Sequence, residues 1–79
     1  MPWTVERDGS ALRVEITSPM DGEWERLLDA IAAASDPQPY AIYLPSRIEG
    51  ASGEDAEMLR ELWDIIGKRG ILILPSKDT

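Results

Sequence analysis

Residues 40–74, YAIYLPSRIEGASGEDAEMLRELWDIIGKRGILIL, decide the fold of this chain. The stretch begins and ends with short apolar runs, at 40–44 and 71–74, which are typical of strands covered on both faces. Between these runs, apolar residues recur at helical spacing over 53–68. Two strands joined by such a helix form a right-handed unit and are therefore parallel. The stretch predicts a parallel βαβ unit.

The helix expected over 53–68 has a wide apolar stripe and a charged outer face. Asp64 and Lys68 form one of its oppositely charged pairs at helical spacing, and Gly67 or Gly70 supplies the left-handed residue that ends it. Tryptophans on the inner stripes of the two expected helices, Trp24 and Trp63, are predicted to lie in the core, whereas Trp3 is available as an exposed contact. The apolar stripe consists of Ala56, Met58, Leu59, Leu62, Trp63, Ile65 and Ile66.

The first half of the chain predicts a β-hairpin and one more helix. Residues 3–7 and 11–17 alternate apolar and polar side chains around Asp8-Gly9-Ser10, a short hairpin signal. From Asp21 the apolar spacing changes to three and four residues, which predicts a helix over 22–34. The residues expected to face inward from the second strand are Leu12, Val14 and Ile16, and those expected in water are Arg13, Glu15 and Thr17.

These elements together predict an α/β fold with the order ββαβαβ. We expect a four-stranded mixed sheet with two helices packed on one or both of its faces. No linker, repeat or low-complexity tract divides residues 1–79, so they form one domain.

Composition excludes several classes of function. The 79 residues include no Cys and no His, which rules out disulfides, zinc sites built on thiolate or imidazole, and Ser/His or Cys/His nucleophile pairs. With 15 acidic against 8 basic residues, the net charge of -7 opposes binding to nucleic acid or anionic membranes. The sequence contains neither a membrane-spanning run nor a recognisable signal peptide, so we expect a cytoplasmic protein without membrane insertion.

The loop before the second helix, RIEGASGED at 47–55, is the strongest candidate site. Ser52 and Asp55 fit the spacing of a capping box, in which the serine accepts from amides of the first turn. Residues 50–53 could also hold an anion at the helix start, but they lack the known nucleotide-loop signatures and lie among acids. We interpret the acids at both helix starts as compensating the helix dipoles and aiding solubility, since their spacing fits no calcium loop.

The order of elements and two short motifs resemble the STAS domain, the fold of bacterial anti-sigma-factor antagonists and of modules appended to anion transporters. Residues 12–22, LRVEITSPMDG, are similar to the family's strand and Gly-x-Leu-Asp type turn, with Met20-Asp21 in place of Leu-Asp. Residues 48–53, IEGASG, resemble its apolar-x-Asp-Ser-Ser-Gly motif, with Gly50 and Ala51 replacing the aspartate and the first serine. By this resemblance, Ser52 takes the place of the serine that a partner kinase phosphorylates, and residues 1–79 lack the family's C-terminal helix.

The resemblance implies a non-enzymatic STAS-like protein-interaction module that binds no cofactor and acts in regulatory partner switching. Its partner would be a protein such as an anti-sigma kinase, and Ser52 would be the phosphorylation site. Two alternatives remain open: a self-associating structural or assembly module such as a homodimer, because the sheet leaves an edge strand unpaired, and a small α/β domain that binds an anion or a nucleotide. The partner is expected to dock on the loop at 46–53 and on the exposed side of the helix over 53–68. The residues predicted to contact it are Asp21, Arg47, Ile48, Glu49, Gly50, Ala51, Ser52 and Gly53.

Overall fold

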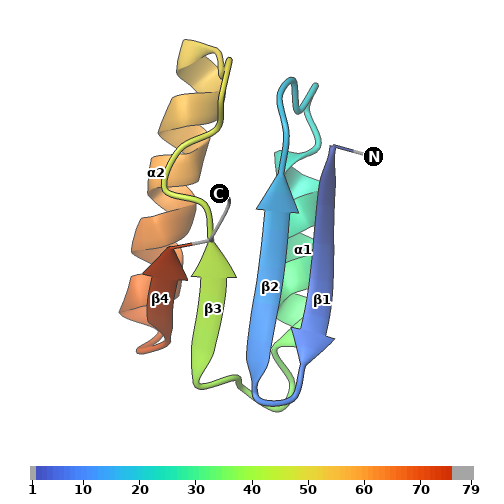
Figure 1. Ribbon diagram of the computed structural model, residues 1–79, viewed down its shortest axis with the longest axis vertical. Coiled ribbons are helices and arrows are strands. Elements are labelled where there is room, and N and C mark those ends of the chain that lie inside the picture. Colours follow the sequence, from blue (N-terminus) through green and yellow to red (C-terminus); the bar gives the residue numbers. More distant parts are fainter. Residues whose placement is uncertain (1, 76–79) are drawn as a thin grey trace.

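The computed structural model describes residues 2–75, which form a four-stranded mixed sheet and two helices (Figure 1). The strands lie in the order β1-β2-β3-β4, with β1 antiparallel to β2 and with β2, β3 and β4 parallel to one another. This arrangement confirms the predicted α/β class and the order ββαβαβ. The bounds are β1 Trp3–Asp8, β2 Ala11–Ile16, α1 Trp24–Ala34, β3 Ala41–Leu44, α2 Gly53–Lys68 and β4 Leu72–Pro75.

The hairpin forms as its alternating pattern predicts. Gly9 turns the chain between β1 and β2 with a φ of 65°, a left-handed conformation that glycine adopts without steric cost. Along β2, Leu12 and Val14 are completely buried, whereas Arg13 and Glu15 are exposed. The inward and outward faces of β2 are therefore those that the sequence predicted.

Both helices cover the same face of the sheet. The chain moves from β2 to β3 to β4 in one direction, and two right-handed crossovers in one direction place their helices on one side. Figure 1 shows α1 behind β1 and β2, and α2 behind β4. No helix within residues 2–75 is long and apolar enough to cross a membrane.

Within residues 2–75, no helix lies over the opposite face of the sheet, which corrects the prediction for the last strand. Leu72 in β4 is 54% exposed, although its apolar run predicted a strand covered on both faces. β3 is better covered, since Ala41, Ile42 and Leu44 are buried. On the open face, the Arg13 guanidinium carbon lies 5.9 Å from the centre of the Tyr43 ring, a cation–π contact.

The core lies between the helices and the covered face of the sheet. It includes Leu12, Val14, Leu27, Ile42 and Leu62, all almost completely inaccessible.

The predicted helical stripes are confirmed in their centres and wrong at their margins. On the helices, Trp24, Leu27, Ile31, Leu59, Leu62 and Ile66 are buried, Met58 and Trp63 are half-buried, and Ala56 and Ile65 are exposed.

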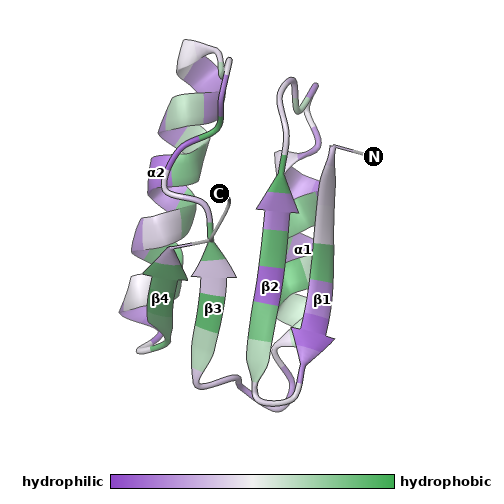
Figure 2. Cartoon of the chain, viewed as in Figure 1, coloured by the Kyte–Doolittle hydropathy of each residue, from purple (hydrophilic) through white to green (hydrophobic). Residues whose placement is uncertain are grey.

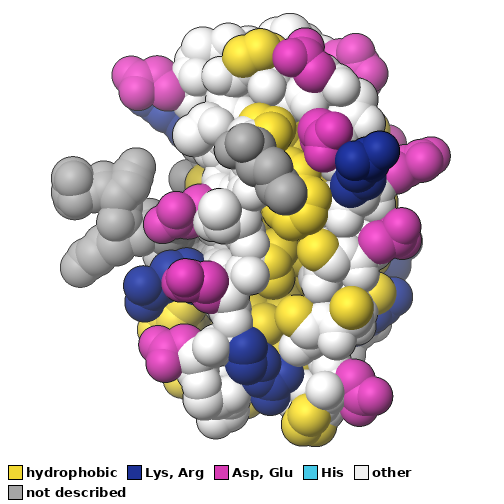
Figure 3. Space-filling model, turned by 90° about the vertical axis from the view of Figure 1, so that its right-hand side faces the viewer, with side chains coloured by type: hydrophobic (Ala, Val, Ile, Leu, Met, Phe, Trp, Pro, Cys, Tyr) yellow, Lys and Arg dark blue, Asp and Glu magenta, His cyan; other side chains and the backbone are white. Residues whose placement is uncertain are grey.

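The two edges of the sheet differ in polarity. β1 ends in Glu6, Arg7 and Asp8, and such charges discourage an edge strand from pairing with another chain. β4 has no charged residue, and Figure 2 shows it hydrophobic along its length. The side of the molecule on which β1 and α1 lie carries a strip of hydrophobic atoms flanked by charged side chains (Figure 3).

Trp3 is not the exposed contact that the sequence allowed. Its ring is half-buried and packs against the core, and its Nε1 donates a hydrogen bond to Glu23 Oε1 at 3.2 Å. Trp3 therefore links β1 to the residue that precedes α1.

Candidate functional site

Two loops meet where β2 and β3 end and where α1 and α2 begin. Ser18 Oγ donates to the Gly50 carbonyl oxygen at 3.1 Å, and the Met20 amide donates to Asp55 Oδ2 at 3.4 Å. The ends of parallel strands are the usual ligand-binding end of open α/β sheets. The structure therefore brings Asp21, which is exposed in a turn with a φ of 52°, to the same end of the molecule as residues 47–53.

Ser52 is the N-cap of α2, as predicted. Its Oγ accepts a hydrogen bond from the Asp55 amide at 3.2 Å, while the residue itself remains exposed. Only half of the expected capping box forms, because the Asp55 carboxylate turns into the protein instead of reaching back to the Ser52 amide. This cap already uses one of the first-turn amides that a bound anion would need.

Asp55 is a buried structural residue, which corrects its interpretation as a solubilising acid. It is 7% exposed, and Trp24 Nε1 donates to its Oδ1 at 2.9 Å. Its carboxylate thereby joins the start of α2 to the start of α1. A signal was present in the sequence, since Asp55 precedes Leu59 by four residues and so falls on the buried stripe of α2.

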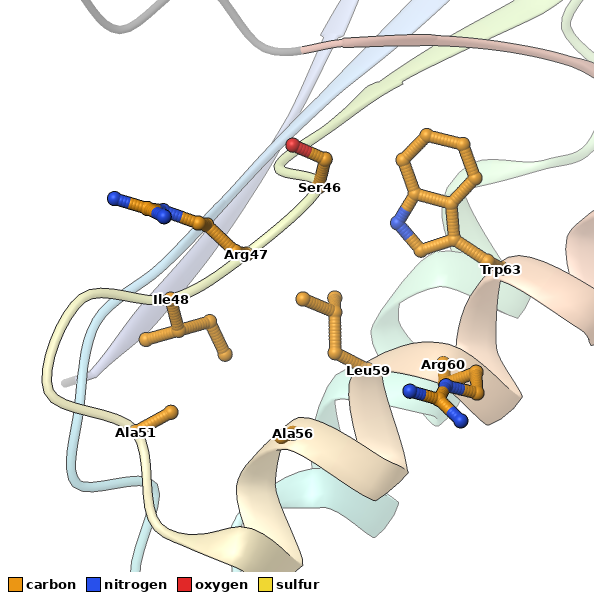
Figure 4. Close-up of a pocket in the computed structure, with 8 residues that line it drawn as sticks. All are labelled: Ser46, Arg47, Ile48, Ala51, Ala56, Leu59, Arg60 and Trp63. Carbon is orange, nitrogen blue, oxygen red and sulfur yellow. The ribbon is translucent and has the colours of Figure 1, made fainter.

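A groove lies between the loop that follows β3 and one side of α2. Its volume is about 610 Å³, and Figure 4 shows Ile48 and Leu59 facing each other across it. Both of these side chains are buried and belong to the core, so the apolar floor is fixed by the fold. The loop contributes Ser46, Arg47, Ile48 and Ala51, and α2 contributes Ala56, Leu59, Arg60 and Trp63.

Trp63 forms the wall of the groove nearest to β3. Its Nε1 donates to the Pro45 carbonyl oxygen at 2.9 Å, which holds the half-buried ring against the loop. The prediction that Trp63 lies in the core is therefore only partly right, because part of its ring remains accessible in the groove.

The groove takes in some of the residues predicted to contact a partner and leaves others outside. Arg47, Ile48 and Ala51 line it. Glu49 lines a second cavity, of about 340 Å³, on the side of the loop that faces Thr17 and Ser18. Among the other predicted contacts, Gly50 is exposed with a φ of 73°, Ser52 and Gly53 begin α2, and Asp21 lies in the neighbouring loop.

Four α2 residues of the groove were not named as site residues from the sequence: Leu59, which belongs to the centre of the apolar stripe, and three residues at its margin. Ala56 and Trp63 were assigned to the apolar stripe, and Arg60 to the charged outer face. Their positions at the margin of the stripe are the only signal that the sequence gives, since the groove depends on where the loop at 45–51 crosses the helix.

The chemistry of the groove suits binding. Its floor is apolar, its wall is aromatic, and Arg47 and Arg60 extend from its loop side and its helix side (Figure 4). Among residues 2–75, no carboxylate lines it, so Ser46, the one described hydroxyl of the groove, has no neighbouring base there. Residues 2–75 contain no cluster of three or more side chains able to hold a metal ion.

Replacing Ser52 with alanine is expected to lower the free energy of unfolding by about 1 kcal/mol, because the Asp55 amide loses its acceptor. Ser52→Asp should retain most of the stability, since aspartate is also a good N-cap. Urea unfolding monitored by tryptophan fluorescence measures both changes. Ser46→Ala is the control, because Ser46 is exposed and caps no helix. An equal loss in Ser46→Ala and Ser52→Ala would contradict the assigned cap.

Comparison of the chain with protein-family models found no match, and comparisons with curated proteins and with solved structures found none either.

Proposed function

We propose that this chain is a non-enzymatic, STAS-like protein-interaction module that docks a protein partner in the groove between residues 46–51 and α2. The observation that supports this proposal is the groove itself, an apolar floor with an aromatic wall at the carboxyl end of the parallel strands. Its volume of about 610 Å³ falls within the usual range of binding pockets, roughly 300–1,000 Å³.

The groove is suited to a peptide segment of a partner. Peptides that dock into grooves place a few apolar anchors in preformed apolar hollows. Ile48 and Leu59 are held by the core, and the hydrogen bond to Pro45 orients Trp63, so little side-chain ordering remains to oppose binding.

Regulation at Ser52 belongs to the same proposal. The resemblance to the STAS domain implies a partner kinase, and Ser52 is an exposed residue that directly follows Ala51, which lines the groove. A phosphate on Ser52 would be stabilised at the start of α2, where the helix dipole favours negative charge. The exposed carboxylate of Glu54 would repel it. In this proposal Ser52 modulates docking, and the groove provides the contact.

The docking site is tested by adding bulk to the groove without adding charge. Ala56→Gln places a longer side chain at an exposed helical position in the groove, and Ala33→Gln makes the same change on α1, away from it. We expect affinity capture from the native cells, quantified by mass spectrometry, to retain a protein with wild type and Ala33→Gln. Ala56→Gln should retain at least about tenfold less of that protein, because the added atoms occupy its site.

Capture of the same proteins in equal amounts by both variants would overturn docking in the groove. A Ser52→Asp arm separates the regulatory part of the proposal, since unchanged capture by that variant would remove the switch and leave the docking site intact. Capture of this chain alone, with dimers in analytical ultracentrifugation, would favour self-association through the uncharged edge of β4.

A further inference from the structure

The groove differs in charge from the rest of the chain. The protein has 15 acidic and 8 basic residues, yet the eight residues within 2–75 that line the groove include two arginines and no acid. Arg47 also borders the second cavity, which Glu15 and Glu49 line, but the described lining of the groove itself is positive and so favours a ligand group of negative charge.

Arg47 and Arg60 have no partner within residues 2–75 that would explain them as structural residues. The only ion pair within that range joins Lys68 to Asp64, and neither groove arginine donates a hydrogen bond there. Arg7 provides the contrast: it donates to the carbonyl oxygens of Gly9, Ala34 and Pro37 at 2.9, 2.8 and 2.6 Å and ties the hairpin to the end of α1. No described residue therefore occupies the donors of the groove guanidiniums, which a ligand could use.

The net charge of the molecule limits what that ligand can be. A polyanion such as nucleic acid or an anionic membrane would face the whole charge of -7, and two arginines are few against it. A short peptide segment meets only the groove and its immediate surroundings. Exposed acids close to the groove in sequence, Glu49 and Glu57, would repel a long acidic run.

We infer that the groove selects a peptide segment that places one or two carboxylates beside a large apolar side chain, the apolar group lying on Ile48, Leu59 and Trp63 and the carboxylates against Arg47 and Arg60. This inference rests on the proposed docking function and names the chemistry of the partner. Guanidinium and carboxylate groups form paired, charge-assisted hydrogen bonds, which give the segment its orientation. The apolar side chain supplies the buried contact.

The test is selection from a phage-displayed library of random peptides on the immobilised protein. Enriched peptides are synthesised with a fluorophore, and their Kd values are measured by fluorescence anisotropy. We expect one or two Asp or Glu residues next to Leu, Ile, Met or an aromatic residue. Changing those acids to Asn or Gln should weaken binding about tenfold, and Arg47→Gln and Arg60→Gln should each weaken it about three- to fivefold, as for partly exposed ion pairs.

Matched controls separate the inference from the proposed function. Arg26→Gln removes an exposed arginine from α1 and should leave the Kd unchanged. The peptides could bind Ala56→Gln more weakly than the wild type, yet show no preference for acids and bind Arg47→Gln and Arg60→Gln with unchanged Kd. That result would overturn the inference and leave the proposed docking function intact. If every enriched peptide binds Ala56→Gln as tightly as the wild type, both the inference and the proposed docking function are overturned.

Discussion

Replacing Asp55 with alanine is expected to destabilise the protein by about 3 kcal/mol, since the change leaves the buried Trp24 Nε1–H and the Met20 amide without their acceptor. For a domain of this size the loss corresponds to a fall in melting temperature of about 12–24 °C, which thermal unfolding followed by circular dichroism measures. No other acid is expected to matter as much to stability, because Asp55 is the only buried polar or charged residue within residues 2–75.

Two controls show whether the hydrogen bonds cause this effect. Asp55→Asn retains one carbonyl oxygen in the position of Oδ1 and should recover about half of the loss, whereas Glu54→Ala, at an exposed acid in the same turn, should change stability by less than about 0.5 kcal/mol. A double-mutant cycle with Trp24→Phe should give a coupling of about 1–2 kcal/mol. Additive effects of the two changes would contradict the proposed link between the helix starts.

The role of Asp55 illustrates how position outweighs residue type. Read by type, an acid in the first turn of a helix compensates the dipole. Read by position, Asp55 continues the series Leu59, Leu62 and Ile66 and must turn inward with them. Its partner, Trp24, comes from a different element, so the sequence could mark the buried position but could not supply the donor that satisfies it.

The elements and their faces could be predicted because they depend on local spacing. Alternation along β2 and the three- and four-residue spacing along the helices set which side chains are buried, and the structure confirms these assignments in the centre of each element. The coverage of β4 could not be predicted in the same way. It depends on the direction of both crossovers across the sheet, and the apolar run at 71–74 carries no information about that direction.

Only the loop half of the candidate site could be predicted residue by residue from the sequence. The loop at 47–53 was identified because small residues before a helix start are informative on their own. The helical half was expected only as the exposed side of the second helix, without its residues, since Ala56, Leu59, Arg60 and Trp63 become site residues only where the loop passes them and leaves a hollow. The hydrogen bond from Trp63 to Pro45 is a tertiary contact between residues that have no local relation in the sequence.

The one-sided sheet predicts unequal effects for two residues that the sequence treats alike. Ile42 and Leu72 lie in similar apolar runs on adjacent parallel strands, yet Ile42 is 0% exposed and Leu72 is 54% exposed. Ile42→Ala should cost about 3–4 kcal/mol, because it removes buried methyl and methylene groups and leaves a cavity between the sheet and the helices. Leu72→Ala should cost less than about 1 kcal/mol, because half of that side chain already contacts water.

Urea unfolding of the two variants measures this difference, and their m-values should match that of the wild type, since neither change alters the fold. The comparison also addresses self-association. If a second copy covered β4 in solution, Leu72 would be buried there, and Leu72→Ala would then cost about as much as Ile42→Ala, with a loss that grows with protein concentration. Equal costs that do not depend on concentration would instead contradict the assignment of both helices to one face of the sheet.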